Sequence, residues 1–261
     1  MLTDEFSSRR LPSNFGDQVS PIVFSELTGV RTTWAPIQKA DFVCIGSILN
    51  SYMRKNCNAI IFGSGLRDPN SIVAPIDTSR IVGVRGEQTV AAMPDDSVQA
   101  IGDPALAIRA MPAFNPVNRK RSGVIALPHF SSYANRTIRK RLGDLSHEGV
   151  EVLAPNTHPV EVARIIRQSD LVLTSSLHGQ IFADALGTRA VRVNFGPSSE
   201  SDFKFEDYSS VFGLGNQAQS VVNFTGARLS ELHAIADNRR SRIAERIDGV
   251  VDNLYRLGRQ L

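Results

Sequence analysis

Short apolar runs alternate with amphipathic stretches along most of the chain. Eight runs have the length and composition of buried strands, at residues 42–45, 59–62, 81–84, 98–101, 123–127, 150–153, 171–173 and 190–193. Between the last four lie three segments with apolar positions at helical spacing, near residues 135–147, 159–168 and 180–186. Alternating strands and helices are typical of a parallel sheet with helices on both faces. The pattern therefore predicts an α/β protein.

The strand-like runs form two groups that are separated by residues 112–122. This segment contains two prolines, two asparagines and a basic cluster, a composition typical of a linker. We predict two Rossmann-like halves about a cleft, at residues 1–115 and 116–228, followed by a C-terminal helix within residues 229–261. Periodicity alone also permits one continuous sheet.

The C-terminal segment has the pattern of one long amphipathic helix, at about residues 229–257. Its apolar face is formed by Ile235, Ile243, Ile247, Val250, Val251 and Leu254. We expect this helix to pack across the body of the fold, with contact to a membrane surface as the alternative.

Composition narrows the class of protein. The 261 residues are 42% hydrophobic, which is enough for one large α/β domain or two small ones. No apolar run approaches the roughly 20 residues that span a bilayer, and residues 1–8 lack the apolar core of a secretory signal. We expect a cytoplasmic protein in which Cys44 and Cys57 are free thiols. No Cys/His pair has the spacing of metal ligands, so no metal is expected.

The net charge of +3 suits an anionic small substrate or an anionic membrane surface. The basic residues do not alternate with aromatic ones, and no nucleic-acid motif occurs. Nucleic acid is therefore not an expected partner.

The most informative segment is residues 171–179. A buried strand, Leu171 to Leu173, leads through a polar turn to His178 and Gly179 at the start of a helix. This places His178 at the carboxyl edge of a parallel sheet, where open α/β sheets bind their ligands. The helix N-terminus attracts anions and lowers the pKa of an imidazole, whereas a bound dianionic phosphate raises it. His178 is thus a candidate proton donor beside an anionic substrate.

Polar residues also follow other predicted strands and turns. Ser175 and Ser176 either cap the helix after them or bond an anion. His129 ends a neighbouring strand on the same sheet edge as His178, so two histidines are expected to converge on one cleft. Arg85 ends the run at 81–84 and is expected to reach an anion in that cleft, with a surface salt bridge as the alternative.

A glycine turn near the N-terminus, Asn14-Phe15-Gly16-Asp17, leads into a helical pattern at residues 18–27. Such a turn can receive an anion or a sugar hydroxyl. Asp17 as a simple N-cap is equally consistent with the sequence. Asp103, in Gly102-Asp103-Pro104, is expected to cap the next helix and to be mainly structural.

These residues resemble the signatures of the polysaccharide pyruvyl transferase family. The specific element is Ser175-Ser176-Leu177-His178-Gly179, which is similar to the family's Ser-x-Leu-His-Gly turn. Weaker elements in matching order are Asn14-Phe15-Gly16-Asp17, Gly63-Ser64-Gly65, Val84-Arg85-Gly86, Gly102-Asp103-Pro104-Ala105-Leu106, Pro128-His129 and Phe203-Lys204-Phe205-Glu206-Asp207-Tyr208. The resemblance covers about residues 14–215.

One position departs from the family pattern. Most of the family carries arginine where this chain has Ser176, and a guanidinium would grip a carboxylate or phosphate with two bonds. Another cation must supply that charge here. By resemblance, Arg67 after the Gly-Ser-Gly stretch and Lys204 in the aromatic segment are candidates beside Arg85.

The resemblance implies a fold like that of GT-B glycosyltransferases and transfer of pyruvate from phosphoenolpyruvate to a hexose of a polysaccharide repeat unit. The product would be a cyclic ketal, phosphate would be released, and the pathway would be exopolysaccharide biosynthesis. The acceptor would be a lipid-linked or free oligosaccharide. The protein would act in the cytoplasm, with peripheral contact at the inner face of the membrane as an added expectation.

The resemblance also implies roles for the candidate residues. His178 would be the general acid, and His129 would orient the donor or take the acceptor proton. Arg85, with Arg67 or Lys204, would hold the phosphate and carboxylate groups. Further substrate contacts would come from Ser175, Ser176, Gly179, Asn14 and Asp17. This scheme requires no metal and no cofactor.

Two other functions stay open. A GT-B glycosyltransferase using a nucleotide sugar would share the fold and a histidine in the cleft. A non-catalytic carbohydrate- or anion-binding module is kept open by the serine at position 176.

Overall fold

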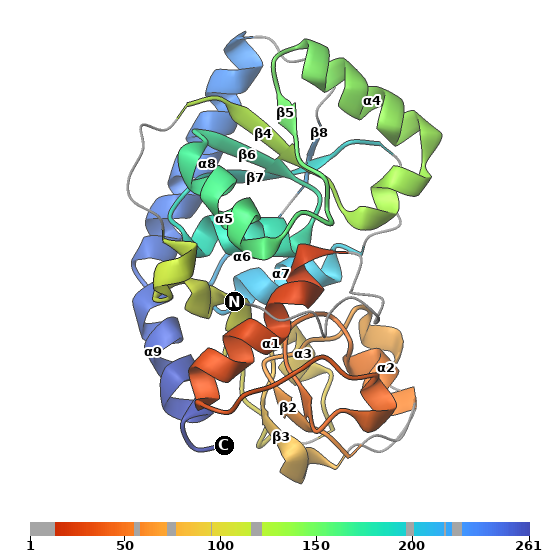
Figure 1. Ribbon diagram of the computed structural model, residues 1–261, viewed down its shortest axis with the longest axis vertical. Coiled ribbons are helices and arrows are strands. Elements are labelled where there is room, and N and C mark those ends of the chain that lie inside the picture. The colour runs from red at the N-terminus through yellow and green to blue at the C-terminus, as the bar shows by residue number, and fades with distance from the viewer. Residues whose placement is uncertain are drawn as a thin grey trace.

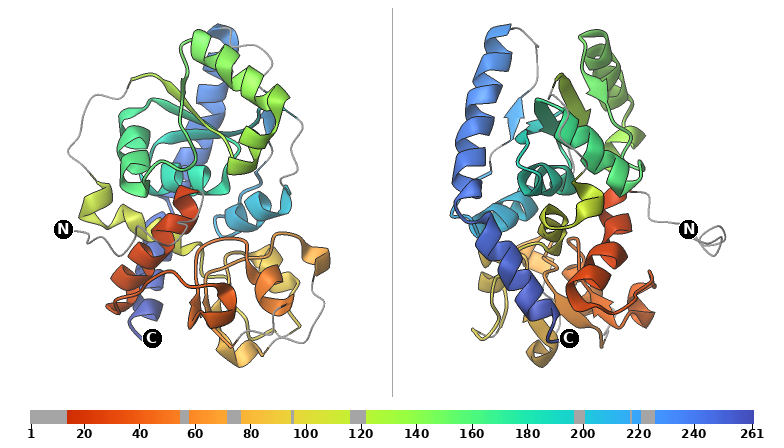
Figure 2. Two further views of the ribbon diagram at one scale, coloured as in Figure 1. Left: turned by 45° about the vertical axis from the view of Figure 1, so that its right-hand side comes forward. Right: turned by 60° about the vertical axis from the view of Figure 1, so that its left-hand side comes forward.

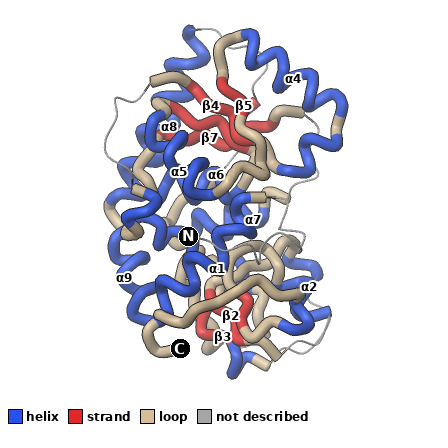
Figure 3. The backbone as a smooth tube through the Cα atoms, viewed as in Figure 1, coloured by secondary structure: helices blue, strands red, loops and turns tan. Residues whose placement is uncertain are grey.

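Figure 1 shows a computed structural model of the protein. The structure describes residues 14–54, 58–71, 77–94, 96–115, 122–196, 201–216, 218–220 and 226–261. The predicted thiol Cys57 and residues 116–121 of the expected linker lie outside the described residues. Within them the protein is α/β, with one sheet of three strands and one of five. All strand pairs are parallel, and the two sheets lie at opposite ends of the molecule (Figure 3).

The smaller sheet comes from the first half of the chain. Its strands are β1 (Phe42–Val43), β2 (Ile60–Phe62) and β3 (Ile81–Gly83), in that spatial order, accompanied by the helices α2 (Leu49–Arg54) and α3 (Glu87–Ala91). The strand expected at residues 98–101 does not form, and Ala100 makes only an isolated bridge to Val84. Gly102 has a positive φ of 89°, and it turns the chain into a 3-10 helix before a longer ladder can pair.

The larger sheet has the order β5-β4-β6-β7-β8. Its strands are β4 (Val124–Leu127), β5 (Glu151–Val152), β6 (Leu171–Thr174), β7 (Arg189–Asn194) and the unanticipated β8 (Gln219–Ser220). The three expected helices are α4 (Arg136–His147), α5 (Pro159–Gln168) and α6 (Leu177–Ala185). Every residue of β6 is buried, as expected for a central strand covered on both faces.

Several elements lie between the two sheets (Figure 1). These are α1 (Phe15–Thr28), α7 (Phe203–Ser210) and the 3-10 helix η5 (Pro104–Arg109). Shorter 3-10 turns are η2 (Ile37–Lys39), η3 (Pro69–Ser71), η4 (Thr78–Arg80), η6 (Pro112–Phe114) and η7 (Phe130–Ala134). One continuous apolar cluster contains Phe62 of the smaller sheet, Leu106 of η5 and Phe182 of α6.

The C-terminal segment is two helices rather than the single one expected. They are α8 (Gly226–Ala244) and α9 (Ile247–Gly258), and the backbone of Arg246 between them leaves helical geometry with φ −126° and ψ −21°. α8 packs on β7, whereas α9 packs on η5 and α1 (Figure 2). The break allows each helix to follow a different surface. No helix in the described part of the chain is long and apolar enough to cross a membrane.

Candidate functional site

A cleft of about 150 Å³ opens where β4 and β6 end. The larger sheet contributes His129, Phe130, Pro155, Ser176, Leu177 and His178 to its walls. The opposite wall consists of Asn14, Phe15 and Asp17 of α1, with Gly46, Ser47, Ile48 and Arg67 from loops of the smaller sheet, and Lys204 of α7 completes it. The cleft therefore joins both halves of the chain.

The strand order explains why the opening lies at this place. The chain leaves β4 to form β5 on one side and returns to form β6 on the other. Loops after β4 and β6 therefore diverge, and such a switch point is where open parallel sheets bind ligands. Since His129 follows β4 and His178 follows β6, the expected convergence of the two histidines on one cleft is observed.

Thr174 organises the turn between β6 and α6. Its Oγ1 donates to the carbonyl oxygen of Leu127 (2.8 Å) and accepts the N–H of Ser176 (3.0 Å). A Cβ atom on Gly179 would lie 2.4 Å from both Leu127 Cδ2 and Thr174 Oγ1. Glycine at this position therefore lets α6 begin in contact with β4. Gly179 is not among the residues that line the cleft, and packing accounts for a glycine at this position. Its expected substrate contact stays a prediction.

The two serines of the turn have different surroundings. Ser175 lies outside the cleft wall, and its Oγ accepts the backbone N–H of His129 (3.0 Å), so it fixes the loop that carries this histidine. Ser176 occupies the N-cap position of α6 but makes no side-chain capping bond. Because Ser176 lines the cleft, its hydroxyl is placed to meet a ligand.

His178 is half-buried against the first turn of α1. A Cβ atom on Gly16 would lie 1.8 Å from His178 Nδ1, so only glycine leaves room for the ring. The Phe15 ring packs edge-on against the imidazole, with 6.3 Å between the ring centroids. Nε2 is buried and has no hydrogen-bond partner among the described residues. The expected strand-to-helix setting is thus observed, and α1 fixes the orientation of the ring.

Burial first, and then the positive charges of Lys204 and Arg85 and the nearby His129, together lower the pKa of His178 to about 3. The imidazole is therefore neutral near pH 7 while the cleft holds no anion. A bound dianion would act in the opposite direction and raise this pKa.

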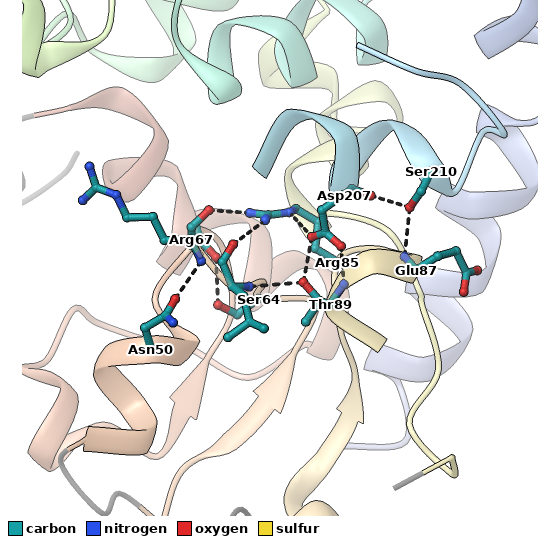
Figure 4. A network of polar contacts seen from close by, with 11 residues as sticks. Asn50, Ser64, Arg67, Arg85, Glu87, Thr89, Asp207 and Ser210 are labelled. Carbon is teal, nitrogen blue, oxygen red and sulfur yellow. Dashed lines mark hydrogen bonds and ion pairs between the residues drawn. The ribbon is translucent and has the colours of Figure 1, made fainter. Parts of the chain in front are cut away.

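Within the described ranges of the chain, Lys204 and Arg67 are the lysine and arginine side chains that line the cleft. Lys204 is only 5% exposed, near the start of α7, and its Nζ lies 5.4 Å from the centroid of the Phe205 ring. Arg67 is exposed at the rim, where its backbone N–H donates to Asn50 Oδ1 (2.7 Å) and its guanidinium extends away from the other labelled side chains (Figure 4). Both candidate replacements for the family arginine are therefore at the cleft.

Arg85 is not placed as the sequence suggested. It is fully buried and does not line the cleft. Its Nε donates to Asp207 Oδ2 (2.9 Å), and its two terminal nitrogens donate to Ser47 Oγ (2.6 Å) and the carbonyl oxygen of Leu66 (2.9 Å) (Figure 4). Arg85 thus forms a buried ion pair rather than a surface salt bridge, as a buried guanidinium requires a paired carboxylate. Its expected contact with an anion stays a prediction.

Asp207 completes this network from α7. Its two carboxylate oxygens accept the backbone N–H and the Oγ1 hydroxyl of Thr89, at 2.7 and 2.8 Å (Figure 4). A Cβ atom on Gly86 would lie 1.8 Å from the Asp207 carbonyl oxygen. The Val-Arg-Gly element therefore serves to dock α7, and with it Lys204, onto the smaller sheet.

Asn14, rather than Asp17, is the N-cap of α1. Asn14 Oδ1 accepts the Asp17 N–H (2.9 Å), and Asn14 Nδ2 donates to Asp17 Oδ2 (2.8 Å). Asp17 lines the cleft, and burial raises its pKa against the opposing effect of the Asn14 bond. Asp103 caps η5 as expected, since its Oδ1 accepts the Ala105 N–H (3.0 Å).

Several residues that line the cleft were not predicted from the sequence. Gly46, Ser47 and Ile48 follow β1, Phe130 follows His129, and Pro155 follows β5. Their position after predicted strands could have indicated them, since ligands bind at the ends of parallel strands. Gly46 has a positive φ of 110°, which suits a glycine. The contact between Gly16 and His178 could not be predicted from local sequence, because the two residues lie on distant segments.

Comparison with known proteins identifies the family of this chain. Residues 4–196 match the family model for polysaccharide pyruvyl transferase. The chain is 28% identical to the succinoglycan biosynthesis protein ExoV of Rhizobium meliloti (strain 1021) over 226 residues, 82% of this chain and 66% of that protein. It is 27% identical to an uncharacterized protein of Acanthamoeba polyphaga mimivirus over 215 residues, 77% of this chain and 71% of that protein.

No solved structure matches the chain significantly. The family match includes the cleft histidines and the turn that presents His178. This chain therefore belongs to the polysaccharide pyruvyl transferase family and is a transferase enzyme.

Proposed function

We propose that this protein transfers pyruvate from phosphoenolpyruvate to a hexose of a polysaccharide repeat unit and releases phosphate. The observation that carries the proposal is the single cleft that brings together His178, His129, Lys204 and Arg67 at a sheet switch point in a member of this family. The name of the Rhizobium relative supports a place in exopolysaccharide biosynthesis.

The chemistry begins at the enol phosphate of the donor. His178 in its protonated form gives a proton to the methylene carbon, and the adjacent carbon becomes electron-poor. A sugar hydroxyl attacks that carbon and loses its proton to a base. The carbon–oxygen bond to phosphate then breaks, and phosphate leaves with the electron pair and takes up one hydroxyl proton. A second hydroxyl attacks, and the other hydroxyl proton restores the imidazolium. The ketal closes with one methyl group, and atoms and charges balance.

The charges of the cleft suit a donor that carries a phosphate and a carboxylate. Lys204 is buried, so its attraction for an anion is less screened than that of a surface lysine. Arg67 at the rim can bond an oxyanion through two parallel N–H groups. These two cations take the place of the guanidinium that most of the family has at Ser176, whereas Arg85 acts through the position of α7.

The low pKa of His178 determines its protonation state before and after the donor binds. The free cleft holds a neutral imidazole, which cannot act as an acid. A bound dianion favours the imidazolium, so the donor itself would charge His178. His129 is held by Ser175 and by a contact between its Nδ1 and Ser131 Oγ (2.8 Å). We assign it to orienting the donor or to accepting the hydroxyl proton.

The proposal also includes a GT-B-like arrangement of the two halves and a cytoplasmic location. The two parallel sheets and the cleft lined from both sides support a GT-B-like arrangement. The reaction would take place in the cytoplasm on a free or lipid-linked oligosaccharide and would use no metal or cofactor. Peripheral membrane contact through the apolar face of α9 has little support, because Val251 and Leu254 pack into the core.

The decisive experiment measures phosphate release. The protein is incubated with phosphoenolpyruvate and oligosaccharides from exopolysaccharide repeat units, and we expect release that depends on both substrates. His178→Gln should lower turnover by roughly 10²–10⁴-fold, the usual contribution of a general acid. His147→Gln is the matched control, since His147 is exposed at the end of α4, and it should leave turnover unchanged.

Two outcomes would favour the alternatives. Thermal stabilisation by nucleotide sugars and not by phosphoenolpyruvate would point to a glycosyltransferase. Binding of both substrates without release of phosphate would point to a non-catalytic module.

A further inference from the structure

A second cavity adjoins the cleft and has a different character. Its volume is about 530 Å³, and it shares Asp17 and Ile48 with the cleft. This volume falls within the roughly 300–1,000 Å³ of small-molecule sites. Trp34, the only tryptophan of the chain, lines this cavity and is 42% exposed. Trp34 does not line the cleft that we assign to the donor, so donor binding does not account for it.

The segment that carries Trp34 is fastened to α1. Thr32 Oγ1 donates to the carbonyl oxygen of Pro21 (3.0 Å), and the Thr32 N–H donates to Ser25 Oγ (3.0 Å). Gly29 ends α1 in a left-handed conformation with φ 74°, which turns the chain back over the helix. These hydrogen bonds fix Thr32 on α1, and Trp34 follows two residues later.

The charges of this cavity do not suit the anionic donor. Among the residues that the structure describes, the ionisable groups of its lining are Asp17, Asp41, Arg31 and the buried thiol of Cys44. Burial raises the pKa of this thiol well above its ordinary value. With the thiol neutral, two carboxylates face one guanidinium. The cations Lys204 and Arg67 line only the cleft. A neutral ligand is thus favoured next to a donor site that attracts anions.

A hexose has the matching chemistry. Its ring presents an apolar face of C–H groups, and an indole offers a large flat apolar surface with one N–H donor. Its hydroxyls donate to carboxylates and exchange bonds with serine and threonine hydroxyls, which Ser20, Thr33 and Ser51 supply here.

We propose that this Trp34 cavity is the acceptor subsite, in which a hexose stacks on Trp34 and directs its hydroxyls past Asp17 into the cleft. The proposal rests on the proposed function and adds the place of the acceptor and the residues that would bind it. Asp17 is the shared residue through which a sugar hydroxyl would reach the donor. Burial raises the pKa of Asp17, and a more basic carboxylate is better suited to accept a hydroxyl proton.

The single tryptophan makes binding directly observable. Methyl β-glucoside, methyl β-galactoside and the acceptor oligosaccharides are titrated into the protein while tryptophan emission is recorded. At least one of these sugars should change the emission saturably. Trp34→Phe removes the signal, so calorimetry follows sugar binding in that variant, where most of the affinity should persist.

Kinetics separate the acceptor subsite from the donor site. Trp34→Ala should raise the acceptor KM about tenfold, or ~1.4 kcal/mol, through loss of the stacking surface. Thermal stabilisation by phosphoenolpyruvate and the donor KM should stay unchanged. Ile22→Ala is the control, because Ile22 is 37% exposed on α1 and lies outside this cavity; it should alter neither KM.

The outcomes distinguish the two proposals. If phosphoenolpyruvate supports turnover but no sugar perturbs Trp34 and Trp34→Ala keeps its acceptor KM, the subsite is overturned and pyruvyl transfer stands. If sugars perturb Trp34 but phosphate is never released from phosphoenolpyruvate, the carbohydrate site stands and the reaction is rejected.

Discussion

At the scale of single residues, the cleft contains a histidine that is neutral in the absence of a ligand and whose ring is positioned by a glycine. His178 packs on Gly16, where a side chain would overlap Nδ1. The Asn14-Phe15-Gly16-Asp17 element thus has three separate functions. Asn14 caps the helix, Gly16 makes room for the imidazole, and Asp17 lines both cavities.

The low pKa of His178 leads to a prediction about protons. Because this pKa is about 3 in the empty cleft, the imidazole is neutral at pH 7 and lacks the acidic proton of the imidazolium. At that pH a phosphate ester is mostly dianionic, since its second pKa is about 6. If the bound donor converts His178 to the acid, binding must take up close to one proton from solution. Calorimetry of phosphoenolpyruvate binding in buffers of different ionisation enthalpy measures this number.

His178→Gln should bind the donor with almost no proton uptake. Turnover of the wild type should fall on the alkaline side, where the imidazolium of the complex loses its proton, and that limb should be missing in the variant. Equal proton uptake by both proteins would show that His178 stays neutral. The acid would then be His129 or a water molecule.

At the scale of elements, the docking of α7 connects the two ends of the molecule. Arg85 follows β3, Asp207 lies in α7, and the pair is completely buried. Arg85 also holds Ser47 at the cleft wall, and Lys204 stands one turn before Asp207 on the same helix. We therefore regard the Arg85–Asp207 pair as a positioning device for the cations and hydroxyls of the cleft.

This interpretation predicts the effects of substitution. Arg85→Ala leaves a buried carboxylate without its partner and should lower the free energy of unfolding by about 3–5 kcal/mol. The double variant Arg85→Met with Asp207→Asn removes both charges, so it should recover part of that loss in urea unfolding. Its donor KM should still rise if the pair positions Lys204. Unchanged stability together with lost donor binding in Arg85→Ala would instead make Arg85 a direct ligand.

At the scale of the whole molecule, the two C-terminal helices connect the sheets from outside. α8 covers β7 of the larger sheet, and α9 packs on η5 and α1 (Figure 2). A Cβ atom on Gly258 would lie 2.7 Å from the carbonyl oxygen of Leu27, so the end of α9 touches the backbone of α1. The helix that supports His178 is thus itself supported by the end of the chain.

Loss of packing in α9 should therefore destabilise the fold without touching the site directly. Leu254 is completely buried, and Leu254→Ala should cost about 2–5 kcal/mol in denaturant unfolding. Asp252→Ala on the exposed face of the same helix should stay within about 0.5 kcal/mol. A cost below about 1 kcal/mol for Leu254→Ala would mean that α9 contributes little to the stability of the body.

Much of the fold could be predicted from local pattern. Seven of the eight strand-like runs contain strands, and the three helices of the larger sheet lie at the expected places. The run at residues 98–101 failed because Gly102 turns the chain away. The C-terminal pattern hid the break at Arg246, since apolar residues continue at helical spacing across it.

The sequence by itself determined which residues end strands and begin helices, and hence that His129 and His178 face one sheet edge. Periodicity and turn residues act over a few positions, so a short stretch of sequence is enough to indicate where such an element begins or ends. Only the tertiary structure decided which cations reach the cleft. Arg85, Arg67 and Lys204 were all candidates from the sequence, but Asp207, 122 residues after Arg85, neutralises Arg85 in the interior. The tertiary structure also placed Gly16 under His178 and Trp34 beside Asp17, because such contacts exist only after distant segments have packed.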